Sequence, residues 1–227
     1  MFWQETNKEE NYVAPDDVVD VAFQISCRSL PVDHAWALSQ AVCAELPWIT
    51  EEPTAGVHTI HVAESGNGWM RPDGAADLLY LSRRTRLVLR VPQHRVDATR
   101  QLAGRRLDVA GHALAVDRPI IRPLVTIAAV FARYVVSGAG QDENAFLAAA
   151  MRELQALGIQ PKKLLCGIEH SIATPHDTVR TRSLMIADLT MSESVRIQQR
   201  GLGPLRHLGC GLFLPHKDIK ELHRVLE

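Results

Sequence analysis

The sequence predicts an α+β protein of two tandem ferredoxin-like units, each an RRM-like βαββαβ repeat with an antiparallel sheet and helices on one face. First, the element order β-α-β-β-α-β, read from hydrophobic periodicity and turn residues, occurs twice along the chain. Second, 227 residues with 46% hydrophobic and 22% charged side chains suffice for two small globular domains. We expect the units at residues 17–118 and 123–216, an acidic N-terminal tail at 1–16, and a C-terminal tail or short helix at 217–227.

The first unit begins with a strand, a helix and a short second strand. Residues 17–27, DVVDVAFQISC, are rich in β-forming side chains and bounded by charge, which indicates a strand. Residues 31–46 carry apolar side chains at helical spacing, with Pro31 at an early helical position and Pro47 after the last turn. Residues 56–63, GVHTIHVA, then predict the second strand.

The first unit ends with a strand, a helix and a final strand region. Residues 78–91 alternate apolar and polar side chains and predict one strand. Pro92 opens a helix and Gly104 closes it. Residues 105–116 supply one or two last strands.

The second unit repeats this order after the segment DRPIIRP. Its predicted strands and first helix are the strand 124–136, the helix 144–158, and the two strands of a hairpin at 162–174 and 178–189. Thr190 and Glu193 have capping-box spacing before a second helix, which Gly201 ends. A final strand, GLFLPH, completes the unit.

Residues 201–211 form a glycine-rich loop with the spacing GxGxxxxxGxG. A dinucleotide-binding glycine motif follows a strand and opens a helix, whereas here a helix precedes the loop and a strand follows it. Glycine backbone and basic side chains fit an extended polyanion, contacted through its phosphates. The candidate RNA contacts in the loop are Gly201, Gly203, Arg206, His207, Gly209 and Gly211. The structural alternative is a helix cap at Gly201 and a bulge at Gly209 and Gly211.

The distribution of charge is more informative than the net charge of −1. Between residues 83 and 106 there are eight arginines and one acid, Asp97. Arg83, Arg84 and Arg86 either bind the phosphates of an RNA stem or flanking strand, or form a solvated strand edge. Only 5% of the residues are aromatic, so RNA recognition would depend on phosphate contacts and hairpin shape.

Several classes of protein are disfavoured by simple sequence features. No apolar run approaches the roughly 18 residues that span a membrane, and the first residues lack an apolar signal core. The four cysteines, Cys27, Cys43, Cys166 and Cys210, form no CxxC pair and no zinc-ligand spacing. We therefore expect a cytoplasmic protein with reduced, mostly buried cysteines, no membrane contact, no metal site and no cofactor.

Segments spread over about residues 17–217 resemble the repeat-associated RNA-binding superfamily of CRISPR systems, most closely its endoribonucleases that process precursor CRISPR RNA. The segments are LPVDHAWAL, SGNGW, LSRRTRLVLRVP, LCG, TRSLMIADL and GLGPLRHLGCGLFLPHK. The resemblance implies a cytoplasmic enzyme that binds CRISPR repeat RNA, cuts within each repeat, keeps the processed guide and joins other effector subunits. It also implies metal-independent cleavage, in which the RNA 2′-hydroxyl attacks the adjacent phosphate and leaves a 2′,3′-cyclic phosphate and a 5′-hydroxyl.

A histidine suits this chemistry, because its unperturbed pKa of roughly 6.5 lies near working pH. The resemblance places the catalytic histidine on or just after the first helix, so His34 and His58 are the candidates, with His61 third. We expect His34 to be partly exposed beside Leu38. We expect His58 and His61 to point to opposite faces of one strand, since their spacing is odd.

Two points stay open from the sequence. The second catalytic group is unassigned, with Ser39, Ser65 and Lys217 available, and Lys217 is also a candidate RNA contact. The function has two alternatives: a non-catalytic RNA-binding scaffold subunit of a CRISPR effector complex, or a small-molecule-binding ferredoxin-like module. The second alternative does not explain the density of arginines.

Overall fold

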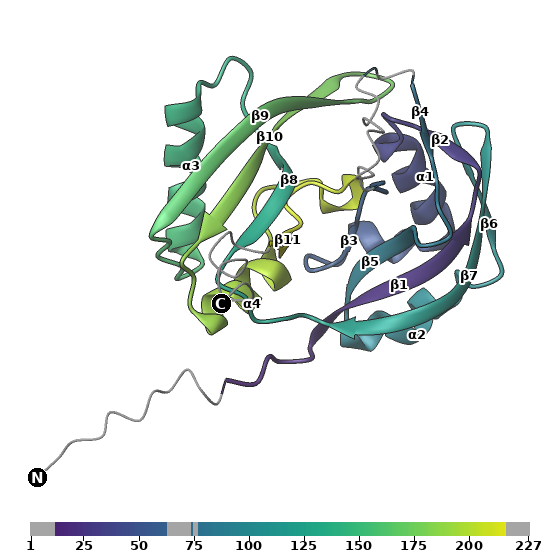
Figure 1. The fold of residues 1–227 in the computed structure, drawn as a ribbon, viewed down its shortest axis with the longest axis horizontal. Helices are drawn as coiled ribbons and strands as arrows, with labels where there is room; N and C mark the ends of the chain where they lie inside the picture. Colours follow the sequence, from purple (N-terminus) through teal and green to yellow (C-terminus); the bar gives the residue numbers. More distant parts are fainter. Residues whose placement is uncertain (1–11, 63–73, 75–76, 217–227) are drawn as a thin grey trace, which may run out of the picture.

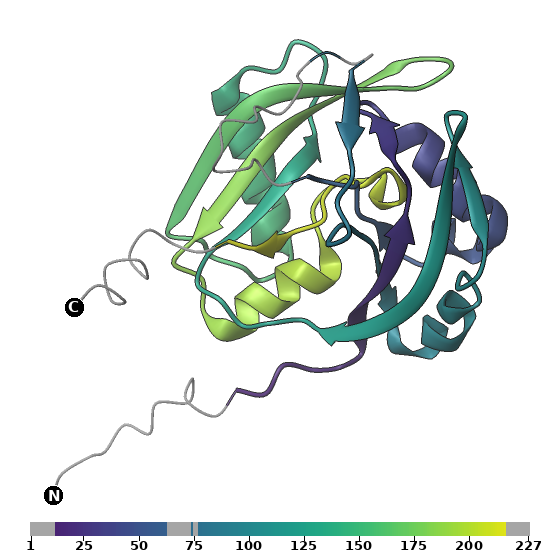
Figure 2. The ribbon, with the colours of Figure 1, turned by 45° about the vertical axis from the view of Figure 1, so that its right-hand side comes forward.

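The computed structural model describes residues 12–62, 74 and 77–216. It contains two larger antiparallel sheets, one formed by the N-terminal half of the chain and one by the C-terminal half. Figures 1 and 2 show the two halves next to each other, with the segment after α4 (yellow) running between them. The glycine-rich loop is therefore an interdomain segment.

The first sheet has the strand order β3-β5-β1-β7-β6. Its strands are β1 (Val18–Ser26), β3 (Gly56–Val57), β5 (Arg86–Pro92), β6 (Arg106–Val109) and β7 (His112–Pro123). The helices of this unit are α1 (Ala35–Glu45), α2 (Val96–Arg100) and the 3-10 turns η1 (Pro47–Thr50) and η2 (Gln93–Arg95). With β6 set aside, β1, β3, β5 and β7 are the four strands of a βαββαβ unit, and β1 lies between β5 and β7. This is the ferredoxin-like arrangement.

The second sheet has the order β11-β8-β10-β9, which is the same arrangement. Its strands are β8 (Val130–Val136), β9 (Lys163–Ala173), β10 (Thr178–Ala187) and β11 (Leu214–Pro215). The helices are α3 (Glu143–Ala156), α4 (Met191–Arg200) and the 3-10 turn η3 (Arg206–Leu208). The predicted α+β class with two tandem ferredoxin-like units is confirmed.

The two faces of the first sheet have different partners. Val21 and Phe23 of β1 and Leu87 of β5 are fully buried in the core of the first unit. Asp20 of β1 pairs in register with Arg90 of β5 on the opposite face. That face is turned toward the second unit, because Arg90 donates hydrogen bonds to it.

The local signals at α4 act as the sequence predicts. The Thr190 side chain accepts from the Glu193 backbone N–H, and the Glu193 side chain accepts from the Thr190 backbone N–H, a complete capping box. Gly201 ends the helix with a φ of 67°, which an L side chain rarely adopts. The buried apolar side of α4 joins β8 and β10 in the second core.

Several expected elements differ in extent. The strand expected at 124–136 begins at Val130, the helix expected between Pro92 and Gly104 is the five-residue α2 after the turn η2, and only Leu214 and Pro215 of GLFLPH form a strand. The strand expected at 56–63 is the two-residue β3, because residues 58–62 leave the sheet. The strand expected at 78–91 is two strands, since β4 (Leu78–Tyr80) pairs with β2 (Ser29–Pro31) and only β5 joins the sheet. That β2 pairing also delays the first helix, which begins at Ala35. β7 continues to Pro123, past the expected boundary at 118, because it pairs with β1 along its length.

No helix in the described part of the chain is long and apolar enough to cross a membrane. The four cysteines are free thiols. Cys210 is buried, and burial raises the pKa of its thiol to about 12. The other three are half-buried.

Candidate functional site

The glycine-rich loop packs against its own protein at three of its four glycines. Gly201, Gly209 and Gly211 all have positive φ, and an added Cβ would collide with neighbouring atoms at each. At Gly209, for example, it would lie 2.9 Å from Thr59 Cγ2. Gly203 also has a positive φ of 72°, but no described atom lies within 4 Å of its Cβ position. The structure thus gives three of these glycines an internal packing role, while Gly203 has open space beside it.

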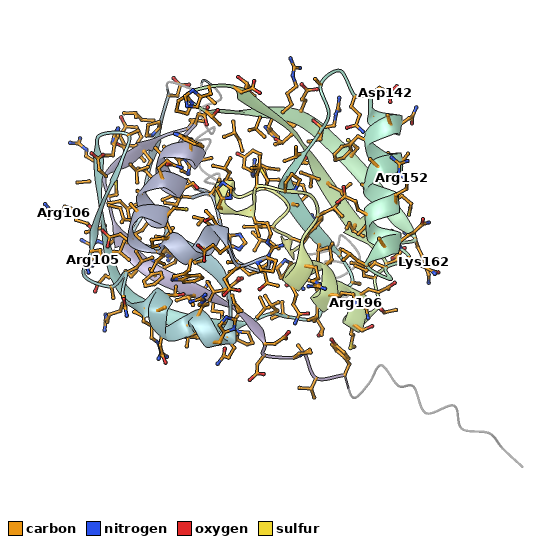
Figure 3. All side chains as sticks on the ribbon, turned by 180° about the vertical axis from the view of Figure 1, so that it is seen from behind. Arg105, Arg106, Asp142, Arg152, Lys162 and Arg196 are labelled. Atoms are coloured by element: carbon orange, nitrogen blue, oxygen red, sulfur yellow. The ribbon has the colours of Figure 1, made fainter. Side chains whose placement is uncertain are left out.

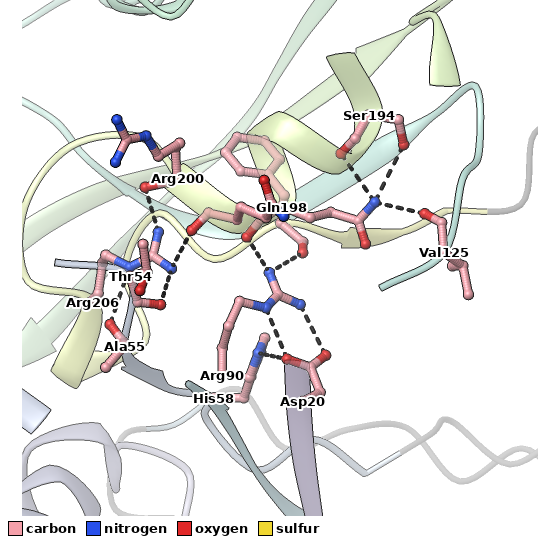
Figure 4. Close-up of polar contacts among 12 residues, drawn as sticks. Asp20, Thr54, Ala55, His58, Arg90, Val125, Ser194, Gln198, Arg200 and Arg206 are labelled. Carbon is pink, nitrogen blue, oxygen red and sulfur yellow. Dashed lines mark hydrogen bonds and ion pairs between the residues drawn. The ribbon is translucent and has the colours of Figure 1, made fainter. Parts of the chain in front are cut away.

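Arg206, expected at an RNA contact, is buried instead, with 9% of its surface exposed. Its guanidinium donates to the carbonyl oxygens of Thr54 (2.9 Å) and Ala55 (3.1 Å) in the first unit. It also donates to the carbonyls of Gln199 (3.1 Å) and Arg200 (2.6 Å) at the end of α4. The expected RNA contact by this side chain is therefore corrected to an internal one that joins the two units (Figure 4).

Arg90 makes the reciprocal connection from the first unit. It is fully buried, and its Nε and Nη2 atoms donate to the two carboxylate oxygens of Asp20 at 2.8 and 2.9 Å. Its Nη1 donates to the carbonyls of Gln198 and Phe213 in the second unit, both at 2.8 Å. Cationic donors at the last carbonyls of α4 also complement the negative end of the helix dipole. We call Asp20, Arg90 and Arg206 the interdomain clamp (Figure 4).

The interdomain clamp shifts the ionisation of its members and of His58. Burial raises the pKa of the Asp20 carboxyl, but Arg90 and His58 lower it by more, so that it lies far below its usual range. Burial and repulsion from Arg90 lower the pKa of Arg206 to about 9. For His58, burial and the two arginines lower the pKa, while Asp20 raises it. The net shift of the His58 pKa is downward, so its ring is neutral at pH 7.

His34 is buried rather than partly exposed as expected, with 2% of its surface accessible. Its Nε2 accepts a hydrogen bond of 3.0 Å from the Ile60 backbone N–H. Its proton is therefore on Nδ1, which donates to the Pro31 carbonyl at 2.8 Å. His34 lies at the start of α1 and ties that helix to the segment 58–61.

A cavity of about 140 Å³ lies between the two units. It is lined by His58, Thr59, His61, Phe131, Arg133, Tyr134, Gly209, Leu212 and Leu214. His58 and His61 thus line one cavity, and the expectation that they point to opposite faces is wrong. The reason is that the segment after Val57 is not a strand, so the alternation of side chains does not apply.

Four side chains that the sequence does not single out, Thr59, Arg133, Tyr134 and His170, lie at or beside this cavity. The ring centroids of His61 and Tyr134 are 6.3 Å apart, and those of Tyr134 and His170 are 5.5 Å apart. His61 Nε2 and Thr59 Oγ1 share a hydrogen bond of 2.8 Å. Arg133 lines the cavity from β8. Their sequence signal is weak, because Arg133 and Tyr134 interrupt an otherwise apolar strand and could be solvated.

The Cas6 family model, described as Cas6 Crispr, matches residues 19–218. The chain belongs to the Cas6 family. A curated relative, the CRISPR-associated endonuclease Cas6 of Myxococcus xanthus (strain DK1622), is 34% identical over 197 residues, which cover 87% of this chain and 81% of the relative.

Two solved structures share the fold at low sequence identity. A CRISPR associated protein Cas6 superposes with a TM-score of 0.59 at 8% identity, covering 88% of this chain and 100% of that chain. A RAMP protein binding different RNA substrates superposes with a TM-score of 0.58 at 12% identity, with the same coverage of both chains. The arrangement of the two ferredoxin-like units is therefore that of these proteins.

The remaining candidate RNA contacts of this Cas6-family chain are spread over its surface. Arg83 and Arg84 are exposed in the turn before β5. Arg86 is half-buried and donates from Nη1 to the carbonyls of Arg83 and Thr85, both at 2.8 Å. His207 is half-buried in η3, where burial lowers its pKa. Lys217 lies outside the described residues.

Basic side chains elsewhere on the Cas6-family chain project from opposite sides of the molecule. Figure 3 shows Arg105 and Arg106 at the edge of the first unit and Arg152, Lys162 and Arg196 at the edge of the second. Among the residues that the structure describes, no group of three or more His, Cys, Asp or Glu side chains could hold a metal ion.

Proposed function

We propose that this protein is a CRISPR repeat-processing endoribonuclease that cuts precursor transcripts without a metal ion. The RNA 2′-hydroxyl attacks the adjacent phosphorus, and the products carry a 2′,3′-cyclic phosphate and a 5′-hydroxyl. The observation that carries the proposal is the interdomain cavity, where His58, His61 and Tyr134 meet the glycine-rich loop. Membership of the Cas6 family supports it, since the Myxococcus relative is named a CRISPR-associated endonuclease.

The cavity side chains divide the proton transfers between them. His58 is neutral at pH 7 because burial lowers its pKa, and neutral imidazole is the form that accepts the 2′-hydroxyl proton. His61 and Tyr134 are the groups that give a proton to the departing 5′-oxygen. Arg133 offsets the negative charge that develops on the phosphorane. The RNA supplies the nucleophile, so the protein orients it and moves protons.

His34 contributes to the same site through position. Both of its ring nitrogens are engaged within the protein, and its Nε2 holds the Ile60 N–H next to His61. Its replacement would release the cavity segment from α1. The direct catalytic role that the sequence suggests for His34 is the alternative that the experiment below compares.

The bound RNA also contacts exposed parts of the chain outside the cavity. We assign phosphate contacts to Arg83 and Arg84, which are exposed. Gly203 has open space at its Cβ position, but its backbone N–H donates to Glu153 Oε2 at 3.0 Å, so an RNA phosphate would have to displace that carboxylate. His207 of the glycine-rich loop and Lys217 remain candidate RNA contacts, as the sequence predicts. Retention of the processed guide and association with other effector subunits complete the proposed role.

The second candidate function is a non-catalytic RNA-binding scaffold subunit. The observation that favours it is the burial of both histidines first expected to be catalytic, His34 and His58, at 2% and 8% exposure. A scaffold binds repeat RNA without cutting it, so a cleavage assay separates the two functions.

The test is single-turnover cleavage of repeat RNA in EDTA, with RNA affinity measured separately. Wild type should cut and leave a 2′,3′-cyclic phosphate. His58→Ala and His61→Ala should each slow cleavage by about 10²–10⁴-fold with little change in affinity. His176→Ala, at an exposed histidine in the β9–β10 turn, is the matched control and should cut at the wild-type rate.

Each other outcome excludes part of the proposal. RNA binding without cleavage by wild type establishes the scaffold function. A 5′-phosphate product, or cleavage only with added metal, refutes the mechanism. Loss of cleavage in a folded His34→Ala variant, with normal rates for His58→Ala and His61→Ala, moves the acid–base role to His34.

A further inference from the structure

The His58 side chain has one ring nitrogen that faces a buried carboxylate at too long a distance for a hydrogen bond. His58 Nε2 lies 3.8 Å from Asp20 Oδ1 and has no hydrogen-bond partner among the described residues. A buried polar atom without a partner is rare in folded proteins and needs an explanation. The distance is typical of catalytic contacts that are long without substrate and shorten when substrate binds.

The carboxylate itself is held rigidly. Both oxygens of Asp20 accept from the Arg90 guanidinium, at 2.8 and 2.9 Å. The same guanidinium donates to the carbonyls of Gln198 and Phe213 in the second unit. The position of the Asp20 carboxylate relative to His58 is therefore fixed by both halves of the protein.

We propose that Asp20 is a positioning residue for His58: it holds the imidazole as the Nε2–H tautomer and leaves Nδ1 to accept the proton of the RNA 2′-hydroxyl. This inference rests on the proposed function, since it assigns a role to Asp20 only if His58 takes that proton. A carboxylate accepts and does not donate, so the nitrogen that faces it carries the proton. In this arrangement the Nε2 edge of the imidazole faces Asp20 and the Nδ1 edge faces the substrate.

The protons and bonds of the cleavage step balance with groups in the site. The 2′-oxygen forms a bond to phosphorus as its proton passes to His58 Nδ1, and the bond from phosphorus to the 5′-oxygen breaks. A proton from the second acid group, His61 or Tyr134, goes to that 5′-oxygen. The imidazolium formed on His58 is balanced by the charge of Asp20, which does not take up the proton.

The charged groups around His58 show why this carboxylate is required. Asp20 faces it from β1, Arg90 from β5 and Arg206 from η3. Both arginines and the burial disfavour a protonated ring, and Asp20 is the one group of the three that favours it. Without Asp20, His58 would be too weak a base to take a proton in this surrounding.

The chain provides a matched control pair on its surface. His94 Nε2 lies 3.0 Å from Glu52 Oε1, but the His94 side chain is 65% exposed and outside the cavity. Glu52→Gln removes a carboxylate from a histidine in the same way as Asp20→Asn does. It should leave the cleavage rate and its pH dependence at wild-type values.

The experiment combines a spectroscopic readout with kinetics on the full chain. Nitrogen-15 spectra of labelled histidine give the tautomer of His58, assigned by the signal that His58→Gln lacks. Spectra are recorded free and with repeat RNA carrying a 2′-deoxy nucleotide at the mapped cut site. Single-turnover rates of wild type, Asp20→Asn and Glu52→Gln are measured across pH, beside the RNA dissociation constant and the thermal midpoint.

We expect the Nε2–H tautomer in wild type. Asp20→Asn should lose about 10²-fold or more in rate with its RNA affinity within about twofold. The acidic limb of its pH–rate profile should move to lower pH, because the carboxylate that raises the His58 pKa is gone. A merely structural role would not move that limb.

Two results overturn the inference: an Nδ1–H tautomer of His58 in wild type, or a folded Asp20→Asn that cuts with an unchanged rate and limb. The wild-type tautomer decides the matter if Asp20→Asn does not fold. Absence of cleavage by wild type refutes the proposed function instead. Failure of the proposed function is therefore seen in the wild-type kinetics, and failure of the Asp20 inference in the His58 tautomer and the Asp20→Asn profile.

Discussion

The free energy of unfolding should distinguish Gly209 from Gly203, because both have left-handed φ angles but different surroundings. Gly209 has a φ of 87° and Gly203 a φ of 72°. An L side chain in this conformation costs roughly 1–2 kcal/mol at either position. At Gly209 the new Cβ would also lie 2.9 Å from Thr59 Cγ2 and 3.2 Å from the Val57 carbonyl oxygen. Overpacking of this kind adds about 1–3 kcal/mol.

We therefore expect Gly203→Ala to lose about 1–2 kcal/mol of stability and Gly209→Ala about 2–5 kcal/mol. Urea denaturation with linear extrapolation measures both, and an unchanged m-value confirms that the folded and unfolded states are comparable. Cleavage should follow the same order. Thr59 lies between His58 and His61, so displacing it disturbs the cavity.

The paired variants can refute the reasoning in two ways. Equal losses of stability for Gly203→Ala and Gly209→Ala would show that contact with Thr59 contributes nothing. A Gly209→Ala protein with wild-type stability and weakened RNA binding would show that this glycine serves a close approach of RNA, as the sequence alone suggests.

Three further predictions concern the clamp and the surface. Arg206→Met should lower the thermal midpoint, because each buried carbonyl left unpaired costs about 1–3 kcal/mol, and an unchanged midpoint contradicts the clamp. The folded-state pKa of Asp20 lies below its unfolded value of about 3.9, so its stabilisation is present above that pH and is lost as pH falls toward the folded pKa. Acid titration of stability should therefore be steeper in that window for wild type than for Asp20→Asn, and equal slopes would exclude a paired Asp20. Changing both Arg83 and Arg84 to Gln should reduce the slope of log affinity against log salt by about 0.7–0.9 per lost contact, and a slope like that of wild type shows that these arginines are solvated instead.

The fold followed from local signals because each unit builds its own core. The apolar stripe of the first helix and the alternation of the strand at 86–92 face partners within the same unit, so the periodicity of the sequence reports their burial directly. The capping residues Thr190 and Glu193 likewise act within one turn. The errors in extent arose at 56–63 and 78–91, where pairing with a distant segment decides which residues join the sheet.

The site did not follow in the same way, because its burial comes from the other unit. Arg90 lies on the sheet face opposite the core of the first unit, and a polar side chain there is typical of a solvated face. The second unit covers that face, so Arg90 is fully buried and Arg206 nearly so. His58 likewise lies beside Arg206 of the second unit, whereas the hydrogen bonds of the buried His34 are made to Pro31 and Ile60 of its own unit. From the sequence alone, the histidines can be ranked only by resemblance to the family. The exposure of each ring depends on tertiary contacts that the sequence does not show.

The segment 54–61 shows how the interdomain clamp and the cavity depend on each other. Arg206 of the second unit holds its start by the Thr54 and Ala55 carbonyls, and His34 of α1 holds its end by the Ile60 N–H. The His58 N–H still donates to the Val88 carbonyl of β5 at 3.0 Å, so the sheet helps to fix His58, whereas His61 lies beyond the two-residue strand and depends on the side-chain contacts. The geometry of the cavity is thus set by side chains from both units. It follows that the first unit alone, although it carries both histidines, lacks the guanidinium that fixes the start of the segment and the β8 wall that faces His61. The proposed acid–base pair therefore needs both units for its geometry, which gives a physical reason for the tandem arrangement.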